Sequence, residues 1–211
     1  MIKRILTAVA LTLSVLNPLR AEDLRSLFVH MPDSILPTLT ASERLDFMDF
    51  MDAGMKAQVR NKLGGESVMT AFTDNYLSIR TFGSGRVEMI LFPYKNNGRN
   101  LICIIKTVTA RYEDSRLYFY NEDWSPVRTE SVIKLPEFRD YLTREALKND
   151  TLDVFMKRSL LRLQSVTSVD GGLEFRYTSL DYIGVDADKY RSWIRVAPIR
   201  YVWNGKCFKR K

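Results

Sequence analysis

Apolar and polar residues follow two different periods along the chain. After Thr40 the apolar residues recur every three or four positions: Leu45, Met48, Met51, Met55, Val59 and Leu63. This spacing predicts an amphipathic helix with one apolar stripe. Thr40 and Glu43 form a capping-box pattern at its start, and Gly64-Gly65 is suited to end it. We therefore predict a helix over 41–63.

Beyond this segment the period changes to two, which is typical of strands. Alternating segments cover 76–80, 86–94, 101–109 and 117–120, and turn residues separate them at Gly83-Ser84-Gly85, Asn96-Asn97-Gly98 and Glu113-Asp114-Ser115. Asn-Gly between two apolar runs is a strong hairpin signal. Segment 101–109 is too apolar to face water on both sides, so we predict a central strand.

The second half repeats the order of helix and hairpins. Pro136-Glu137 is suited to open a helix, and a short helix is predicted over 187–194. Hairpin signals at Asp170-Gly171-Gly172 and Asn204-Gly205 are each flanked by apolar runs. We predict an α+β fold, an antiparallel β-meander packed by helices on one face. A single compact domain over 22–211 and two similar helix-plus-sheet lobes, 22–125 and 126–211, both remain open.

The first 21 residues have the order of a secretory signal peptide. A basic start, an apolar run and a small residue before a polar stretch occur in sequence, and we expect cleavage after Ala21. Lys3, Arg4 and Arg20 lie in that segment, which contains no acidic residue, so its loss lowers the formal charge from +7 to +4. This charge argues against a nucleic-acid partner. We expect a periplasmic or extracellular protein that does not span a membrane after cleavage.

The side chains that could carry chemistry are few. Asp46, Asp49 and Asp52 recur every third residue, but they fan around the helix and match the charge that its N-terminal half favours, with Lys56, Arg60 and Lys62 following them. His30, the one histidine, has no nucleophile motif to serve. Cys103 and Cys207 are either buried thiols or a disulfide. We predict no catalytic residue, metal site or cofactor.

Aromatic residues give the second kind of candidate. A set of six residues combines them with two of the aspartates as a candidate binding surface: Trp124, Tyr120, Trp193, Trp203, Asp46 and Asp49. Aromatic rings can line a glycan or peptide groove, although they more often pack in cores and on sheet faces. Both interpretations stay open at this point.

Several stretches resemble one known family. They are MPDSILPTLT, RLDFMDFMDAGMKAQVRNKLGG, LICIIKTVTARYEDSRLYFYNEDW and the terminal YVWNGKCFKRK. Together they resemble domain-of-unknown-function family 3256, small exported proteins of Bacteroidales. The resemblance covers most of the chain after the leader. It implies a location in or outside the cell envelope and brings no activity, cofactor or site residue.

Two functions are compatible with these observations. The first is a non-catalytic exported module that binds an envelope protein, a peptide or a glycan, with its oligomeric state open. The alternative is a hydrolase of an envelope or dietary glycan or peptide that uses carboxylates such as Asp46, Asp49, Asp123 or Asp181. The second requires two carboxylates that converge in a pocket.

Overall fold

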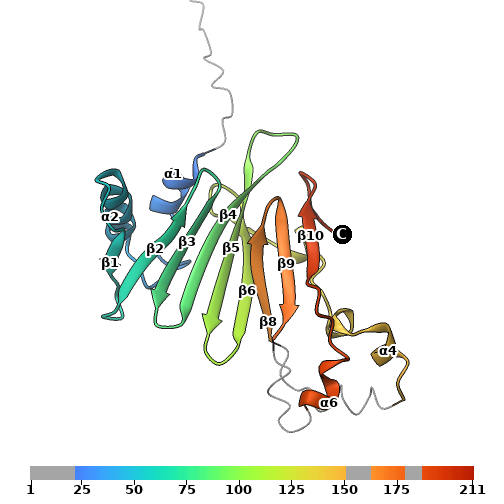
Figure 1. Cartoon of the computed structure of the whole chain (residues 1–211). Coiled ribbons are helices and arrows are strands. Elements are labelled where there is room, and N and C mark those ends of the chain that lie inside the picture. The colour runs from blue at the N-terminus through green and yellow to red at the C-terminus, as the bar shows by residue number, and fades with distance from the viewer. Residues whose placement is uncertain (1–21, 151–162, 179–186) are drawn as a thin grey trace, which may run out of the picture.

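The computed structural model describes residues 22–150, 163–178 and 187–211 (Figure 1). The expected leader, 1–21, and Asp181 lie outside these ranges. The helices and strands, in chain order, are α1 (Leu24–Val29), α2 (Ala41–Asp52), β1 (Gln58–Arg60), β2 (Glu66–Phe72), β3 (Tyr76–Phe82), β4 (Gly85–Pro93), β5 (Asn100–Thr109), β6 (Glu113–Tyr120), β7 (Pro126–Val127), α3 (Thr129–Val132), a 3-10 helix (Phe138–Tyr141), α4 (Arg144–Leu147), β8 (Gln164–Val169), β9 (Gly172–Tyr177), α6 (Ala187–Arg191), β10 (Ile199–Trp203) and β11 (Phe208–Arg210).

Two antiparallel sheets organise the chain, which confirms the predicted α+β class with a meander. The large sheet has seven strands in the order β1 to β7, and the small sheet has four in the order β11-β10-β9-β8. Each consecutive pair of strands in the large sheet is antiparallel. A plain meander of this kind follows from short turns between neighbouring strands.

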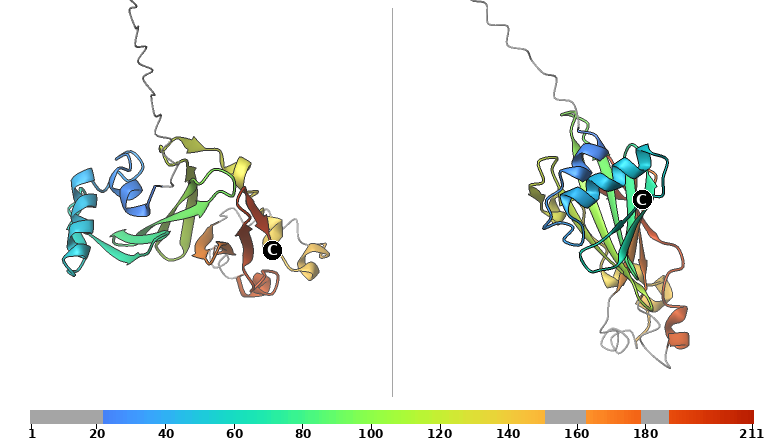
Figure 2. Two further views of the ribbon diagram at one scale, coloured as in Figure 1. Left: turned by 90° about the horizontal axis from the view of Figure 1, so that it is seen from above. Right: turned by 90° about the vertical axis from the view of Figure 1, so that its left-hand side faces the viewer.

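The large sheet is covered on both faces, by different layers (Figure 2). On one face α1 and α2 pack against Leu77, Met89 and Ile104 in a first apolar cluster. On the other face the small sheet packs against Ile90 and Cys103 in a second cluster. Because successive side chains of a strand point to opposite faces, β4 and β5 contribute to both clusters. The predicted central strand 101–109 is confirmed, since Leu101 to Ile105 are all buried.

The predicted helix 41–63 is wrong in length. The capping box is present, with Thr40 and Glu43 bonded to each other, but α2 ends at Asp52. Gly54, with φ 66°, ends it: its N–H donates to Met51 O at 3.0 Å and the next N–H, of Met55, to Phe50 O at 2.8 Å. This is a Schellman motif, and Gly54 rather than Gly64 is the glycine that ends the helix.

The shorter helix also changes the predicted apolar stripe. Leu45, Met55 and Leu63 are exposed, and the face that packs inward is formed by Arg44, Phe47 and Met48. Val59 is buried, but in strand β1. Lys56, Arg60 and Lys62 lie beyond the end of α2, so they do not form the C-terminal half of the helix as predicted.

The remaining predictions concern the second half and the first hairpins. The hairpins at Asp170-Gly171 and Asn204-Gly205 are present as β8–β9 and β10–β11. Strand β6 begins at Glu113, so the turn predicted at 113–115 falls earlier in the chain. The helix predicted from Pro136 is a 3-10 turn followed by α4. Strands β1, β2 and β7 were not predicted.

Two further structural findings concern the cysteines and the membrane. Cys103 is buried and Cys207 half-buried, and both are free thiols. Burial raises the pKa of Cys103 well above its usual value, and the nearby charge of Glu88 adds to the effect. None of the helices in the described part of the chain has the length and apolar character needed to cross a bilayer.

Candidate functional site

A pocket of about 670 Å³ opens between the two sheets. We call it the inter-sheet pocket. The large sheet contributes the β2–β3 turn, the start of β3 and the end of β4, and the small sheet contributes the β8–β9 turn and the end of β10. Its lining residues are Thr73, Asn75, Tyr76, Ile90, Leu91, Phe92, Pro93, Ser168, Val169, Asp170, Gly171 and Trp203. Its size falls in the range of small-molecule sites.

Trp203 forms an aromatic wall of this pocket. Its indole N–H donates to the carbonyl oxygen of Pro93 at 2.7 Å. Its ring centroid lies 5.8 Å from that of Phe92, 5.5 Å from Tyr94 and 5.0 Å from Phe208. The ring is half-buried. Because the N–H is already bonded and neighbouring rings fix the indole, Trp203 offers a ligand a rigid apolar surface.

Tyr76 is a second aromatic residue of the pocket, and a buried carboxylate fixes its orientation. Its hydroxyl donates to Glu88 Oε1 at 2.7 Å, and Arg86 Nε donates to Glu88 Oε2 at 3.2 Å. Glu88 is only 3% exposed. Burial, and then the hydrogen bond to Glu88, raise the pKa of Tyr76 to about 12. The ring is therefore held in place and neutral at physiological pH.

The β8–β9 turn forms the opposite rim. Gly171 has φ 70°, as a two-residue hairpin turn requires, and its carbonyl oxygen accepts from Trp203 N at 2.8 Å. The next residue, Gly172, lies so close to β10 that a Cβ there would collide with the carbonyl oxygen of Tyr201. These glycines bring Ser168 and Asp170 against the large sheet, where they supply the polar side of the pocket.

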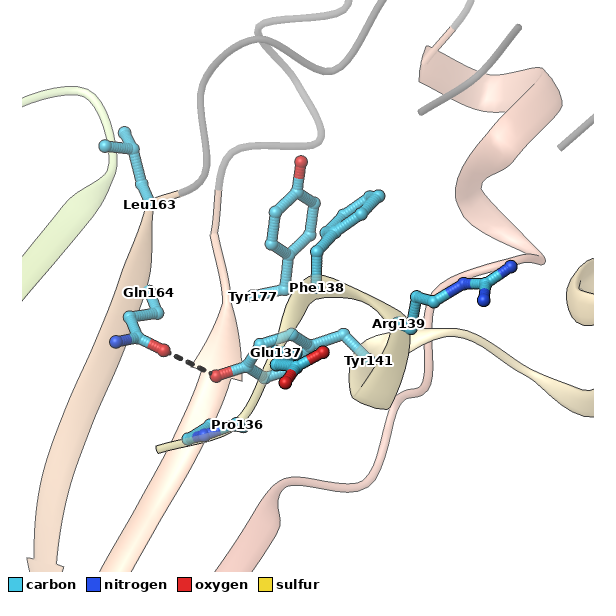
Figure 3. A pocket seen from close by; sticks show the side chains of 8 residues that line it. All are labelled: Pro136, Glu137, Phe138, Arg139, Tyr141, Leu163, Gln164 and Tyr177. Atoms are coloured by element: carbon cyan, nitrogen blue, oxygen red, sulfur yellow. Dashed lines mark hydrogen bonds between the residues drawn. The ribbon is translucent and has the colours of Figure 1, made fainter. Parts of the chain in front are cut away.

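A second pocket, of about 450 Å³, lies beside the 3-10 helix (Figure 3). Tyr141 donates its hydroxyl to Gln164 Oε1 at 2.7 Å, and burial raises the pKa of this tyrosine. The ring of Tyr177 lies 5.1 Å from Phe138 and 5.9 Å from Tyr141. Figure 3 shows Arg139 pointing away from the Tyr141–Gln164 pair. The aromatic rings of this pocket pack on one another, and the hydroxyl group of Tyr141 is already bonded to Gln164.

Tyr120 and Trp124, two of the predicted surface residues, lie together, away from Trp203. Their ring centroids are 5.7 Å apart, and both rings pack against the first apolar cluster. Trp124 has φ 63°, a left-handed conformation that costs a bulky residue about 1–2 kcal/mol.

A set of hydrogen bonds in the β6–β7 turn holds this conformation. Trp124 N–H donates to Asn121 O at 2.9 Å, and Asn121 N–H donates to Ser125 O at 2.9 Å. The side chain of Glu122 accepts from Asn100 N at 2.9 Å, and Asp123 accepts from Ser125 N at 2.9 Å. The polar side chains of the turn are thus engaged in fixing its shape.

The other predicted residues are distributed over three regions. Trp193 packs edge-to-face against Tyr190, with centroids 5.0 Å apart, in a third small cluster. Asp46 and Asp49 are exposed on α2, which lies beside β1. Asp123 is exposed in the β6–β7 turn, at the other side of the large sheet. Among the six predicted residues the structure therefore brings together Tyr120 with Trp124, and Asp46 with Asp49 one turn apart on α2, but it does not unite them in one surface.

His30 and Asp52 have local structural partners. The ring Nδ1 of His30 lies 2.9 Å from Ser26 O, one turn earlier. Asp52 accepts from both terminal nitrogens of Arg25, at 2.8 and 2.5 Å, and this lowers the pKa of the carboxyl group. In the described ranges no three His, Cys, Asp or Glu side chains gather as a metal-binding group.

Two buried charges were missed by the sequence analysis. Arg44 is 1% exposed and donates to the carbonyl oxygens of Val29, Met31 and Leu39 and to the carboxylate of Asp33. The signal for Arg44 is its spacing of three and four from Phe47 and Met48. The signal for Glu88 is its spacing of two and four from Ile90 and Phe92 on β4, which places it on the same buried face of the strand.

Comparison with known proteins agrees with the resemblance found in the sequence. The model of a family described as "Protein of unknown function (DUF3256)" matches residues 16–208. A solved structure of a domain of an uncharacterized protein from Porphyromonas gingivalis W83 superposes with a TM-score of 0.78 at 24% identity. The match covers 89% of this chain and 98% of that one, and at this identity it shows the fold alone. No curated protein matches the chain.

Proposed function

Since the chain belongs to the DUF3256 family, whose function is unknown, we propose from its geometry that it is an exported binding module that holds a neutral glycan in the inter-sheet pocket. The observation that carries the proposal is the composition of that pocket. Trp203 and Tyr76 provide fixed aromatic surface, and Thr73, Asn75 and Ser168 provide hydroxyl and amide groups. Sugars combine apolar ring faces with hydroxyl groups, so they complement such a lining.

The charges of the lining support binding rather than hydrolysis. In the described part of the chain, Asp170 is the one carboxylate that lines the pocket. Glycoside hydrolysis ordinarily needs two carboxyl groups, about 5 to 10 Å apart across the bond. Export to the periplasm or the cell exterior, inferred from the order of residues 1–21, would place the pocket where envelope and dietary glycans occur.

A pair of matched substitutions tests the proposal. Ser168→Trp places a large ring on the pocket side of β8, because Ser168 pairs with Leu173, which packs against the large sheet. Val202→Trp places the same ring on an exposed position of β10. The probes are neutral oligosaccharides based on glucose, mannose and galactose, and saturation-transfer NMR measures their binding. We expect binding of at least one probe by the parent protein and by Val202→Trp, and loss of that signal in Ser168→Trp. Absence of binding by every probe, or equal binding by both variants, would overturn the proposal.

A further inference from the structure

A third pocket, which is lined by charged residues, lies at the end of the large sheet opposite the inter-sheet pocket. It measures about 460 Å³ and is formed by the β5–β6 turn, the end of β9 and the segment after α6 (Figure 1). Three arginines line it: Arg111, Arg191 and Arg195. We call it the arginine pocket. Because consecutive turns of a meander alternate between its two ends, the β2–β3 and β5–β6 turns are on opposite ends of the large sheet.

The arginine pocket carries excess positive charge. Among the described residues that line it, Glu113 is the one carboxylate. That carboxylate lies 3.5 Å from Arg86, which also pairs with the buried Glu88. Arg191 lies 3.5 Å from Asp188, whose side chain is almost fully exposed. Within the described ranges no carboxylate lies in ion-pair contact with Arg111 or Arg195. Guanidinium groups gathered in one pocket repel one another unless an anion is bound between them.

Hydrogen bonds hold the backbone around the arginines in place. Arg195 N–H donates to Tyr141 O at 2.8 Å, and Arg176 donates to the carbonyl oxygen of Val196 at 3.1 Å. On the other side, Thr178 donates its hydroxyl to Glu113 O at 2.6 Å, which ties β9 to the start of β6. The guanidinium of Arg111 lies over the ring of Tyr112, 5.5 Å from its centroid. The side chains thus project from a fixed frame.

We infer that the arginine pocket binds a phosphate group. A guanidinium presents paired N–H donors that match the oxygens of a phosphate. A phosphate has enough oxygens to accept from more than one arginine, and its charge offsets the excess positive charge of the pocket. Ile194 and the exposed Val196 border the site, so the ligand carries an organic group as well. It is a phosphate ester, either free or as a lipid headgroup. This inference does not rest on the glycan proposed for the inter-sheet pocket.

The experiment uses the purified protein and two probes. Glycerol 1-phosphate is titrated by calorimetry, and phosphatidylglycerol vesicles are compared with phosphatidylcholine vesicles by co-sedimentation. Binding of the soluble probe alone identifies a free phosphate ester, and binding of the anionic vesicles alone identifies a headgroup. Either supports the inference if it requires the arginines. Binding should also weaken as salt is raised, because the interaction is between charges.

Two double variants show whether the pocket is responsible. Arg111→Gln with Arg195→Gln removes two charges from the pocket, and Arg116→Gln with Arg128→Gln removes two charges from exposed positions elsewhere, on β6 and before α3. We expect at least a tenfold loss of affinity in the first and less than a twofold loss in the second. Circular dichroism verifies that both remain folded. Equal losses in the two, or no binding of either probe by the parent protein, would overturn the inference.

Discussion

Among the described residues two charged side chains are buried, one on each face of the large sheet, and they are held differently. Arg44, in the helical layer, donates to three backbone carbonyl groups and to Asp33. Glu88, between the sheets, accepts from the side chains of Tyr76 and Arg86 on neighbouring positions of β3 and β4. Arg44 therefore determines the path of the chain between α1 and α2, whereas Glu88 orients side chains beside the inter-sheet pocket.

The difference has consequences for stability. A buried carbonyl group that loses its hydrogen-bond donor destabilises the folded state by its full desolvation cost. Arg44 donates to several such groups at once. Glu88 has fewer partners, and one of them, Arg86, also contacts Glu113 and is partly exposed. Substitutions at Arg44, Glu88 and their partners should therefore differ in their cost to stability.

The largest effect is expected for Arg44→Met. The variant keeps much of the side-chain volume but leaves the carbonyl oxygens of Val29, Met31 and Leu39 without a donor. We expect a loss of about 3–5 kcal/mol in the free energy of unfolding, measured by urea denaturation. The matched control is Arg25→Met, which removes an exposed pair with Asp52 and should cost at most about 1 kcal/mol. Equal losses would show that Arg44 is not the organising contact.

Glu88→Gln is expected to have a smaller effect. The amide keeps the shape of the carboxylate and can still accept from Tyr76, but it no longer neutralises Arg86. A loss of about 1–3 kcal/mol is expected, again from urea denaturation. Glu130→Gln is the control, because that carboxylate is exposed and lies 4.0 Å from Arg128. If Glu88→Gln instead stabilises the protein, the negative charge of Glu88 does not contribute to folding stability, and its role is to orient Tyr76 beside the pocket.

Tyr76→Phe removes one donor from Glu88 and should cost about 1–2 kcal/mol at neutral pH. The pKa of Tyr76 is raised from 10.0 to about 12 in the folded protein. The folded state therefore holds this proton more tightly than the unfolded state. Its stabilising contribution is complete below about pH 10 and is lost as pH rises through 12.

The measurement is urea denaturation at several pH values between 9 and 12. The parent protein should lose stability more steeply with pH than Tyr76→Phe does. Tyr118→Phe, at an exposed position of β6, is the control and should keep the parent's slope. Parallel pH profiles for the parent and Tyr76→Phe would contradict the role assigned to the Tyr76–Glu88 bond.

The smallest effect is expected for Asp33→Asn. The hydrogen bond from Arg44 lowers the pKa of Asp33 below 3.8. Its contribution to stability is therefore present above about that pH and is lost as the pH falls through the lowered value. NMR titration of the carboxyl carbon should report the lowered pKa, and Asp33→Asn should flatten the acid side of the stability profile. An ordinary pKa for Asp33 would show that its contact with Arg44 is not kept in solution.

Local signals in the sequence predicted much of the secondary structure. Asn-Gly and Asp-Gly turns located two hairpins of the small sheet, and the two-residue period located β3, β4 and β5. The main failure was the end of α2. Apolar residues at Met55, Val59 and Leu63 continue the helical period by coincidence, while Gly54 ends the helix. A single glycine with a left-handed conformation outweighed the spacing of the residues that follow it.

The candidate sites depended on tertiary structure to a greater extent. The sequence indicated Trp203 as an aromatic residue of interest, but its pocket partner Tyr76 lies more than a hundred residues earlier and on the other sheet. Asp46 and Asp49 form a regular row in the sequence, yet α2 presents them to solvent because Arg44, Phe47 and Met48 occupy its inward face. The acidic residues at the inter-sheet pocket are instead Asp170, which lines it, and the buried Glu88, which accepts from Tyr76.

Local sequence patterns were enough to locate β3, β4 and β5, the hairpins of the small sheet and the capped start of α2, because period and turn chemistry act over a few neighbouring residues. Only the tertiary structure decided which charges are buried, which aromatic rings meet and where the pockets open. From the sequence alone, Arg44 resembles an ordinary surface residue of a helix. In the folded protein, carbonyl groups of the segment between α1 and α2 surround its guanidinium group. The physical reason is that burial and pairing depend on packing between segments far apart in the chain, which a local pattern does not encode.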